Sequence, residues 1–270
     1  MRTNRTRRRP GLSLALIMGS VAVAHAGPPW TPDALREWQP GVEMIHAGRQ
    51  EEGFEWILER QRQRPEDPCG YYLAAQGYLG DDLGSPDEEE RVSLGKQLLE
   101  QGLGLDNGPP GDVARRFCKG AMYGVRAAQR VENGGYLGAA FDGKKMRRTM
   151  LDLLKEHPDF VDCKFWLGTY NYYAAVLPKY IKFFRTLLFL PSGDRDRGIA
   201  QLEEATRRGV FEKYNAHWVL SGVYDEQEQP GKKLELLERF NVAYPADVGA
   251  ARELAQNLAL AEPRELEKGV

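Results

Sequence analysis

The sequence predicts an all-α protein made of stacked antiparallel helical hairpins. Two observations support this fold class: apolar residues recur three and four positions apart over most of the chain, and glycine or proline ends most of these runs. The alternating pattern that indicates β-strands is nearly absent. Helices joined by such short turns are expected to pack against their neighbours in the sequence.

The first 26 residues have the composition of a secretory signal peptide. Five arginines precede an uncharged run over 11–24, and Ala24-His25-Ala26 has the small-x-small form of a cleavage site. The apolar run is shorter than the roughly 20 residues that a membrane-spanning helix needs. We expect cleavage before Gly27 and a periplasmic or secreted protein, with a retained N-terminal anchor as the alternative.

Residues 27–270 are expected to form a single domain. The leader holds five of the 37 basic side chains and none of the 39 acidic ones, so the remainder has a net charge of −7. This charge argues against nucleic acid as a partner. A chain of this length also buries a sizeable core without a disulfide framework.

Helical spacing with clear start and stop signals places the elements along the chain. In the first part, helices are expected over 33–47, 51–64, 71–80, 86–103, 112–131 and 136–157. An aromatic-rich segment from Pro158 to Pro191 follows. Four further helices are expected after it: one with Ile199, Leu202 and Ala205, one from Phe211 to Val223, one from Pro230 to Tyr244, and one with apolar positions Val248, Ala251, Ala255 and Leu258.

A recurring proline motif marks three helix boundaries. Arg64-Pro65-Glu66-Asp67, His157-Pro158-Asp159 and Tyr244-Pro245-Ala246-Asp247 each end one helix, and the acid is expected to cap the next. Tetratricopeptide hairpins are commonly joined in this way, although the intervals here do not follow a 34-residue period.

The chain from Arg126 to Asp247 resembles a group of bacterial exported tetratricopeptide proteins and, more distantly, the eukaryotic mitochondrial outer-membrane tetratricopeptide family. The residues that carry the resemblance are Arg126-Ala127, Gly135-Tyr136, Pro158-Asp159, the run Trp166 to Tyr170, Tyr172-Tyr173, Leu177-Pro178, Gly193-Asp194-Arg195, Arg197-Gly198 and Tyr244-Pro245. The resemblance implies a right-handed helical solenoid that binds or scaffolds a protein or peptide partner. It provides no catalytic residues to transfer.

The segment 177–190 combines basic and apolar side chains. Lys179, Lys182 and Arg185 lie three residues apart, while aromatic residues such as Phe183 and Phe184 occupy the positions between them. This pattern is typical of a helix in a membrane interface, which would make the protein a peripheral membrane protein. The alternative is a helix buried between repeat layers with its bases extended outward.

Trp166, Tyr170 and Tyr173 fall on one face of a predicted helix. They form either an aromatic-lined groove for a peptide or helix, or core aromatics packed between helices. The preceding helix carries a basic cluster that suits either phosphate or an acidic partner, or is an ordinary exposed helix face: Lys144, Lys145, Arg147 and Arg148.

Of three cysteines, Cys69, Cys118 and Cys163, at least one is unpaired within the chain. Each lies near the start of a first-in-hairpin helix, and we expect Cys118 to pair with Cys163. The three histidines after residue 26 show no metal-ligand spacing, and no serine lies in a nucleophile elbow. The sequence therefore predicts a non-enzymatic protein without a metal or cofactor.

Overall fold

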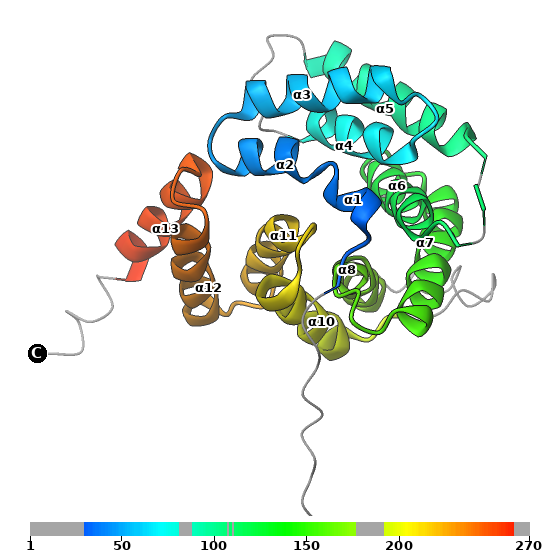
Figure 1. Ribbon diagram of the computed structural model, residues 1–270. Coiled ribbons are helices and arrows are strands. Elements are labelled where there is room, and N and C mark those ends of the chain that lie inside the picture. Colours follow the sequence, from blue (N-terminus) through cyan, green and yellow to red (C-terminus); the bar gives the residue numbers. More distant parts are fainter. Residues whose placement is uncertain (1–29, 81–87, 107, 110, 177–191, 262–270) are drawn as a thin grey trace, which may run out of the picture.

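The computed structural model describes residues 30–80, 88–106, 108–109, 111–176 and 192–261, and all regular secondary structure within these ranges is helical (Figure 1). This confirms the all-α class. The helices of the first part are α1 (Asp33–Arg36), α2 (Gln39–His46), α3 (Gln50–Gln63), α4 (Pro68–Leu79), α5 (Glu88–Gly104), α6 (Val113–Glu132) and α7 (Tyr136–Glu156). The second part contains α8 (Asp162–Val176), α10 (Arg195–Arg208), α11 (Lys213–Glu226), α12 (Pro230–Ala243) and α13 (Val248–Ala261).

The predicted helix over 33–47 is divided into α1 and α2. Pro40 lies in the first turn of α2, and proline lacks the N–H that a continuous helix would donate to the carbonyl of Arg36. The break turns Trp38, between the two helices, fully into the core, where it meets Trp56 of α3 at 6.4 Å between ring centroids.

Aspartates start several helices, as the proline motif predicts for two of them. Asp67 accepts the backbone N–H of Cys69 at the start of α4, and Asp247 accepts that of Ala250 at the start of α13. Asp159 does not have this role, because α8 begins three residues later, at Asp162.

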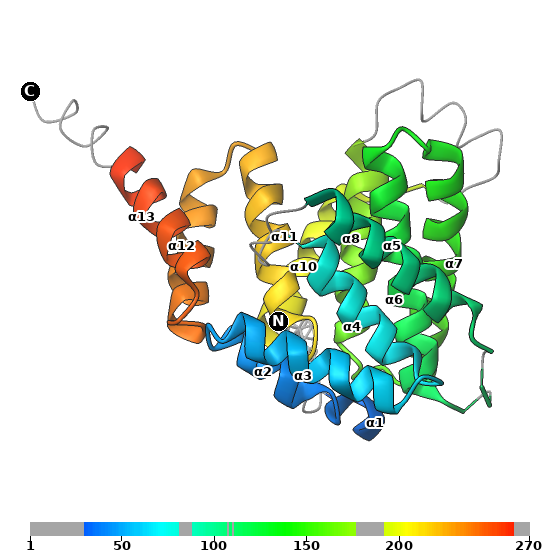
Figure 2. The ribbon, with the colours of Figure 1, turned by 90° about the horizontal axis from the view of Figure 1, so that it is seen from above.

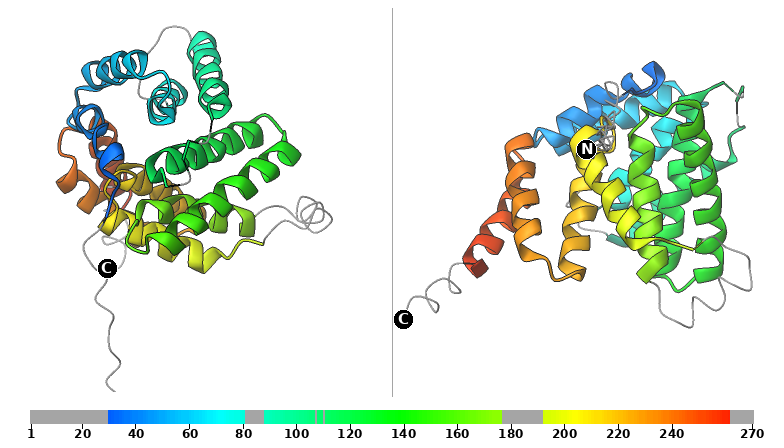
Figure 3. Two further views of the ribbon diagram at one scale, coloured as in Figure 1. Left: turned by 45° about the vertical axis from the view of Figure 1, so that its right-hand side comes forward. Right: turned by 90° about the horizontal axis from the view of Figure 1, so that it is seen from below.

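Helices adjacent in sequence pack side by side, and α6 has the most neighbours. It lies against α7 and also contacts α4 and α5, while α8 packs against both α7 and α10. Figure 3 shows α6, α7 and α8 side by side. The α12–α13 hairpin stands on the opposite side of the molecule from α7 (Figure 2).

Two glycines allow a close contact between the backbones of α8 and α10. A Cβ atom on Gly198 of α10 would lie 2.6 Å from the backbone nitrogen of Tyr172 in α8, and one on Gly168 would lie 2.9 Å from the carbonyl oxygen of Gly198. Any side chain at these positions would push the two backbones apart. The small residues therefore set the separation of α8 and α10.

The buried residues form one main core and one small C-terminal core. The main core runs from Leu35 to Leu236 and includes the fully buried Phe117, Phe160 and Tyr172. The second core consists of Leu237, Phe240 and Ala250, with four partly buried neighbours around them.

Contacts also join the N-terminal residues to much later parts of the chain. Trp30 stacks on His157 with 4.4 Å between ring centroids, and the backbone N–H of Trp30 donates to the carbonyl of Asp159. At the end of α2, His46 stacks on Tyr214 of α11 at 4.1 Å. Among the described residues, no helix is long and apolar enough to cross a membrane.

Candidate functional site

The aromatic face of α8 runs from the core to the surface. Trp166 is only 6% exposed, packs on Tyr72 of α4, and fills the space above Gly124 of α6, where a Cβ atom would lie 2.3 Å from its ring. Tyr170 is partly buried beside Gly143 of α7. The buried indole of Trp166 thus packs as a core residue, so it is not accessible to a binding partner.

Tyr173 is the exposed member of this face. Its side chain is 39% exposed and packs edge-on against Tyr172 at 5.1 Å. Burial of the remainder raises the pKa of Tyr173 to about 12, so the hydroxyl stays protonated at neutral pH. Of the three residues predicted to form a groove, Tyr173 is the one that a partner can reach in this conformation.

A buried carboxylate, Asp162, holds the turn before α11. Its Oδ1 atom accepts the backbone N–H groups of Val210, Phe211 and Glu212 at 2.8–2.9 Å. The hydroxyl of Thr31 donates to Oδ2 at 3.3 Å. Burial raises the pKa of Asp162, and the three backbone donors oppose this rise. The geometry is that of a structural cap with its acceptor sites already occupied.

Glu212 is a second buried carboxyl in the same place. It is completely buried, accepts a 2.5 Å hydrogen bond from the hydroxyl of Tyr72, and accepts another at 2.7 Å from the amide of Asn215. Burial raises its pKa to about 7. A carboxyl with this pKa suits proton transfer in general. Here it is fully enclosed, and its hydrogen bonds join α4 to α11, which indicates a structural role.

Sequence reasoning did not identify either carboxyl as buried. Asp162 and Glu212 are 50 positions apart and both lie near charged or polar neighbours. The only local signal is that Asp162 follows two apolar residues at a helix start. Nothing in either segment indicates that they meet.

A second charged network joins α5, α6 and α7. Arg126 donates two hydrogen bonds to Asp142, which is only 2% exposed, and Arg130 donates another to the same carboxylate. Arg126 also reaches Glu100 at 2.9 Å. These hydrogen bonds, above all those to Asp142, raise the pKa of Arg126, which therefore stays charged. The carboxylate of Asp142 therefore holds α7 against α6.

The cysteine pairing predicted from the sequence is wrong. Cys118 forms a disulfide with Cys69, with their Cα atoms 5.1 Å apart, and Cys163 is free and buried. The reason is that α4 packs directly against α6, which brings two helix starts within bridging distance. Burial raises the pKa of the Cys163 thiol, so this thiol is unreactive in the folded protein.

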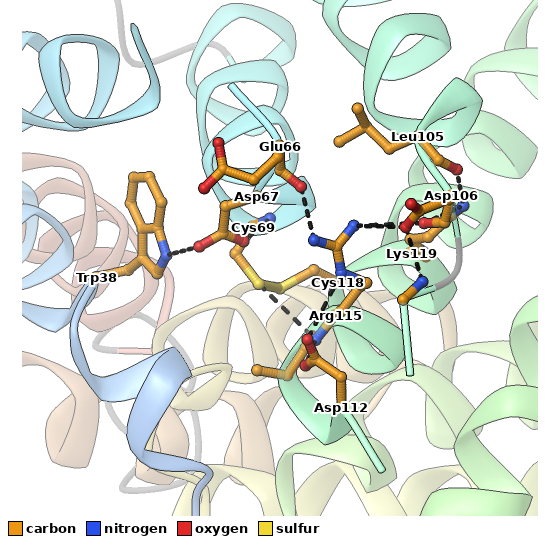
Figure 4. A network of polar contacts seen from close by, with 12 residues as sticks. Trp38, Glu66, Asp67, Cys69, Leu105, Asp106, Asp112, Arg115, Cys118 and Lys119 are labelled. Carbon is orange, nitrogen blue, oxygen red and sulfur yellow. Dashed lines mark hydrogen bonds and ion pairs between the residues drawn. A yellow bond between two sulfur atoms is a disulfide. The ribbon is translucent and has the colours of Figure 1, made fainter. Parts of the chain in front are cut away.

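Polar contacts surround the disulfide and hold the neighbouring turns (Figure 4). Arg115 donates to the carbonyl of Glu66 at 2.8 Å and to the carboxylate of Asp106 at 3.3 Å. Lys119 donates to the carbonyl of Leu105 at 2.5 Å, and the indole of Trp38 donates to Asp67 at 3.2 Å. The bridge and these contacts therefore join the turn before α4, the end of α5 and the start of α6.

The residues predicted for membrane contact lie outside the described residues: Lys179, Lys182, Phe183, Phe184 and Arg185. Their role stays a prediction. Within the described ranges, no group of three or more histidine, cysteine or acidic side chains is arranged to hold a metal ion. The chain matches no family model, no curated protein and no solved structure.

Proposed function

We propose that this protein is an exported, non-enzymatic helical scaffold of the tetratricopeptide-like type, which binds a protein or peptide partner in the periplasm or outside the cell. The leader-like N-terminus and the stacked hairpins support the proposal. The hydrogen-bond partners of the buried ionisable groups support it too. The perturbed carboxyls Asp162 and Glu212 and the buried Asp142 all have partners within the fold.

The observation that carries the proposal is the outer face of α13. Val248 is 67% exposed and Leu258 is 43% exposed, and Ala251 and Ala255 between them are exposed as well. Their spacing normally indicates a buried helix face. Instead, α13 contacts α12 through Ala250 on its other side. An apolar helix face at the end of a helical stack has the geometry that receives another helix.

An amphipathic helix of a partner protein is the occupant that fits this face. The outer face of α13 spans three helical turns, and a partner helix recognises such a face through apolar side chains at matching intervals. The chain's own residues 262–270 are a poor alternative, since their only large apolar side chains are Leu266 and Val270 and Pro263 disfavours a continuous helix.

Photocrosslinking in the producing cells tests this function. A photoreactive amino acid at Leu258 should crosslink to a discrete protein, and the same amino acid at the exposed Glu238 of α12 should not. The variant Val248→Glu should abolish the crosslink from position 258. If both positions yield the same products, or if neither yields any, the α13 face is not the binding surface.

The aromatic groove of Trp166, Tyr170 and Tyr173 is a separate hypothesis for the same function. Since Trp166 is buried, we expect Tyr173→Ala to weaken partner capture if this site is used, while the fold stays intact. Partner capture that is lost in the α13 variant but kept in Tyr173→Ala would assign binding to α13 alone.

A further inference from the structure

Residues 30–36 lie as a bound segment against the start of α8, although they come much earlier in the chain. This stretch, called the N-terminal segment below, ends with α1 (Asp33–Arg36). Figure 2 shows α1 at one edge of the molecule, and α1 also contacts α6. The contacts of the segment indicate what kind of peptide this surface accepts.

Trp30 is held by its ring and by its backbone. The indole stacks on His157 at 4.4 Å and meets Phe160 edge-on at 5.6 Å, both measured between ring centroids. The backbone N–H donates to the carbonyl of Asp159 at 3.0 Å. The side chain is still 36% exposed, so the indole lies in an open slot and not in the core. An aromatic side chain suits such a slot, because stacking adds to the gain from burial.

Thr31, Pro32 and Leu35 are the buried residues of the segment. The Thr31 hydroxyl donates to Asp162 at 3.3 Å and is enclosed with it, since Thr31 is 1% exposed. Leu35 is fully buried in the main core. The other residues after Thr31 are exposed: Asp33, Ala34 and Arg36. The surface thus fits an aromatic residue, a hydroxyl residue followed by proline, and a leucine four positions after the hydroxyl.

The surface under the segment has internal contacts of its own. Asp162 accepts three backbone N–H groups of residues 210–212, and Phe160 packs on Phe117 at 4.9 Å between ring centroids. Glu212 is bound to Tyr72. These contacts do not involve the segment, so the surface is preorganised for an occupant.

The segment likewise has backbone hydrogen bonds of its own. The N–H groups of Leu35 and Arg36 donate to the carbonyl of Pro32, and that of Glu37 donates to the carbonyl of Asp33. Segment and surface are therefore each organised locally. A terminal segment bound in this way has the geometry of a peptide on a receptor, and it can be exchanged for an equivalent segment of another chain.

We propose that the surface formed by His157, Phe160 and Asp162 is a binding site for an extended segment of a partner protein, and that residues 30–36 occupy this site until such a segment displaces them. The matching partner segment has an aromatic residue, then serine or threonine with proline, and then leucine. The protein's own segment competes with it at an effective concentration on the order of millimolar.

A phosphate on the hydroxyl residue does not fit this site. Thr31 is enclosed, and its hydroxyl lies against the carboxyl of Asp162, which would repel a phosphate. The partner segment is therefore unphosphorylated at this position.

This site is distinct from the α13 face and does not rest on it. A photoreactive group at Leu258 reports on the α13 face, whereas a peptide of the chain's own sequence reports on the site at the start of α8. Either proposal can therefore fail alone.

Fluorescence anisotropy tests the proposal with a labelled peptide of residues 29–37, acetylated and amidated, and protein lacking residues 1–26. Trp30→Ala with Thr31→Ala loosens the protein's own segment and should bind the peptide at least about tenfold more tightly than the unaltered protein. Loss of a hydrogen bond to a carboxylate alone corresponds to about that factor.

Matched controls use another aromatic residue and altered peptides. Tyr136→Ala removes an aromatic side chain that is 41% exposed on α7, and this variant should bind the peptide as weakly as the unaltered protein. Peptides with alanine in place of Trp30, or with phosphothreonine in place of Thr31, should not bind the loosened variant. Circular dichroism and thermal melting verify that each variant is folded.

The unaltered protein gives a second measurement that needs no variant. Hydrogen exchange at the Trp30 amide should become faster as peptide is added, because the displaced segment loses its bond to Asp159. This measurement decides if the loosened variant does not fold. The proposal is overturned if exchange is unchanged at about millimolar peptide. It is also overturned if the folded variant binds the peptide no better than the unaltered protein, or binds the altered peptides equally well.

Discussion

The α8–α10 pair and the α12–α13 pair are both antiparallel, but they are held together differently. In the first pair, Gly168 and Gly198 let the two backbones touch, and Leu202 is completely buried. In the second, a core of three fully buried side chains is supplemented by Lys233, which forms an ion pair with Glu253 at 2.6 Å.

The difference indicates a gradient of local stability along the chain. The first pair is part of the main core, whereas the second has few buried apolar contacts and a large apolar face in water. Local opening begins where buried contacts are few. We therefore expect amide hydrogens of α13 to exchange by local opening, and those of α8 to exchange only on global unfolding. The predictions below test this contrast, from the largest expected effect to the smallest.

Removal of the disulfide should destabilise the main core, to which α8 and α10 belong. The bridge closes a segment with a sequence separation of 49, for which chain entropy predicts a stabilisation of about 4 kcal/mol. Cys69→Ala with Cys118→Ala should lower the free energy of unfolding by that amount in urea titrations. A reducing agent should have a similar effect on the unaltered protein and none on the variant. Equal stability of the oxidised and reduced protein would contradict this.

The buried Glu212 should make the main core more stable in acid. Its pKa in the folded protein, about 7, lies above the ordinary value of 4.5. The neutral carboxyl therefore favours folding below pH 4.5, and this contribution is lost as the pH rises through 7. The lost stability is on the order of 3 kcal/mol, from 1.36 kcal/mol for each pKa unit.

Glu212→Gln isolates this effect. His46 and His217, whose pKa values burial lowers to about 4, act in the opposite direction but are present in both proteins. The stability of the unaltered protein relative to Glu212→Gln should thus fall as the pH rises. A difference that is constant across the pH range would show that Glu212 has the same pKa in the folded and the unfolded protein.

A methyl group between α8 and α10 should separate the tight pair. Gly198→Ala places a Cβ atom against backbone atoms that cannot move aside, at an expected cost of about 2–3 kcal/mol. Gly222→Ala in α11 is the matched control, because apart from the backbone of its own helix no atom lies within 4 Å of its added Cβ atom. This control should stabilise the protein by up to about 1 kcal/mol through helix propensity. Similar losses in both variants would show that close packing is not the cause.

Charged residues on the outer face of α13 should leave stability almost unchanged. Val248→Glu with Leu258→Glu alters two exposed side chains, so the free energy of unfolding should stay within about 0.5 kcal/mol of the original. Thermal melting measures this directly. A loss of several kcal/mol would mean that the face is covered in solution, for example by a second copy of the chain.

The helices could be predicted from the sequence because their signals are local. The expected ranges 51–64 and 136–157 agree closely with α3 (Gln50–Gln63) and α7 (Tyr136–Glu156), since apolar spacing, proline and glycine act within a few residues. The disulfide partner of Cys118 could not be found in this way, because it depends on which helices pack together. Periodicity also marked the apolar face of α13 without showing that the described fold leaves it uncovered.

Hydrogen bonds between distant parts of the chain distinguish this protein from an open repeat array. Thr31 bonds to Asp162 across 131 positions, and Tyr72 bonds to Glu212 across 140. Simple repeat arrays gain order one unit at a time and tolerate shortening from an end. Thr31 and Tyr72 are synthesised long before Asp162 and Glu212. Their buried hydroxyl groups therefore find these partners only after most of the chain has been made. Fragments cut between α7 and α10 should therefore fail to fold separately and should regain structure only when they are mixed.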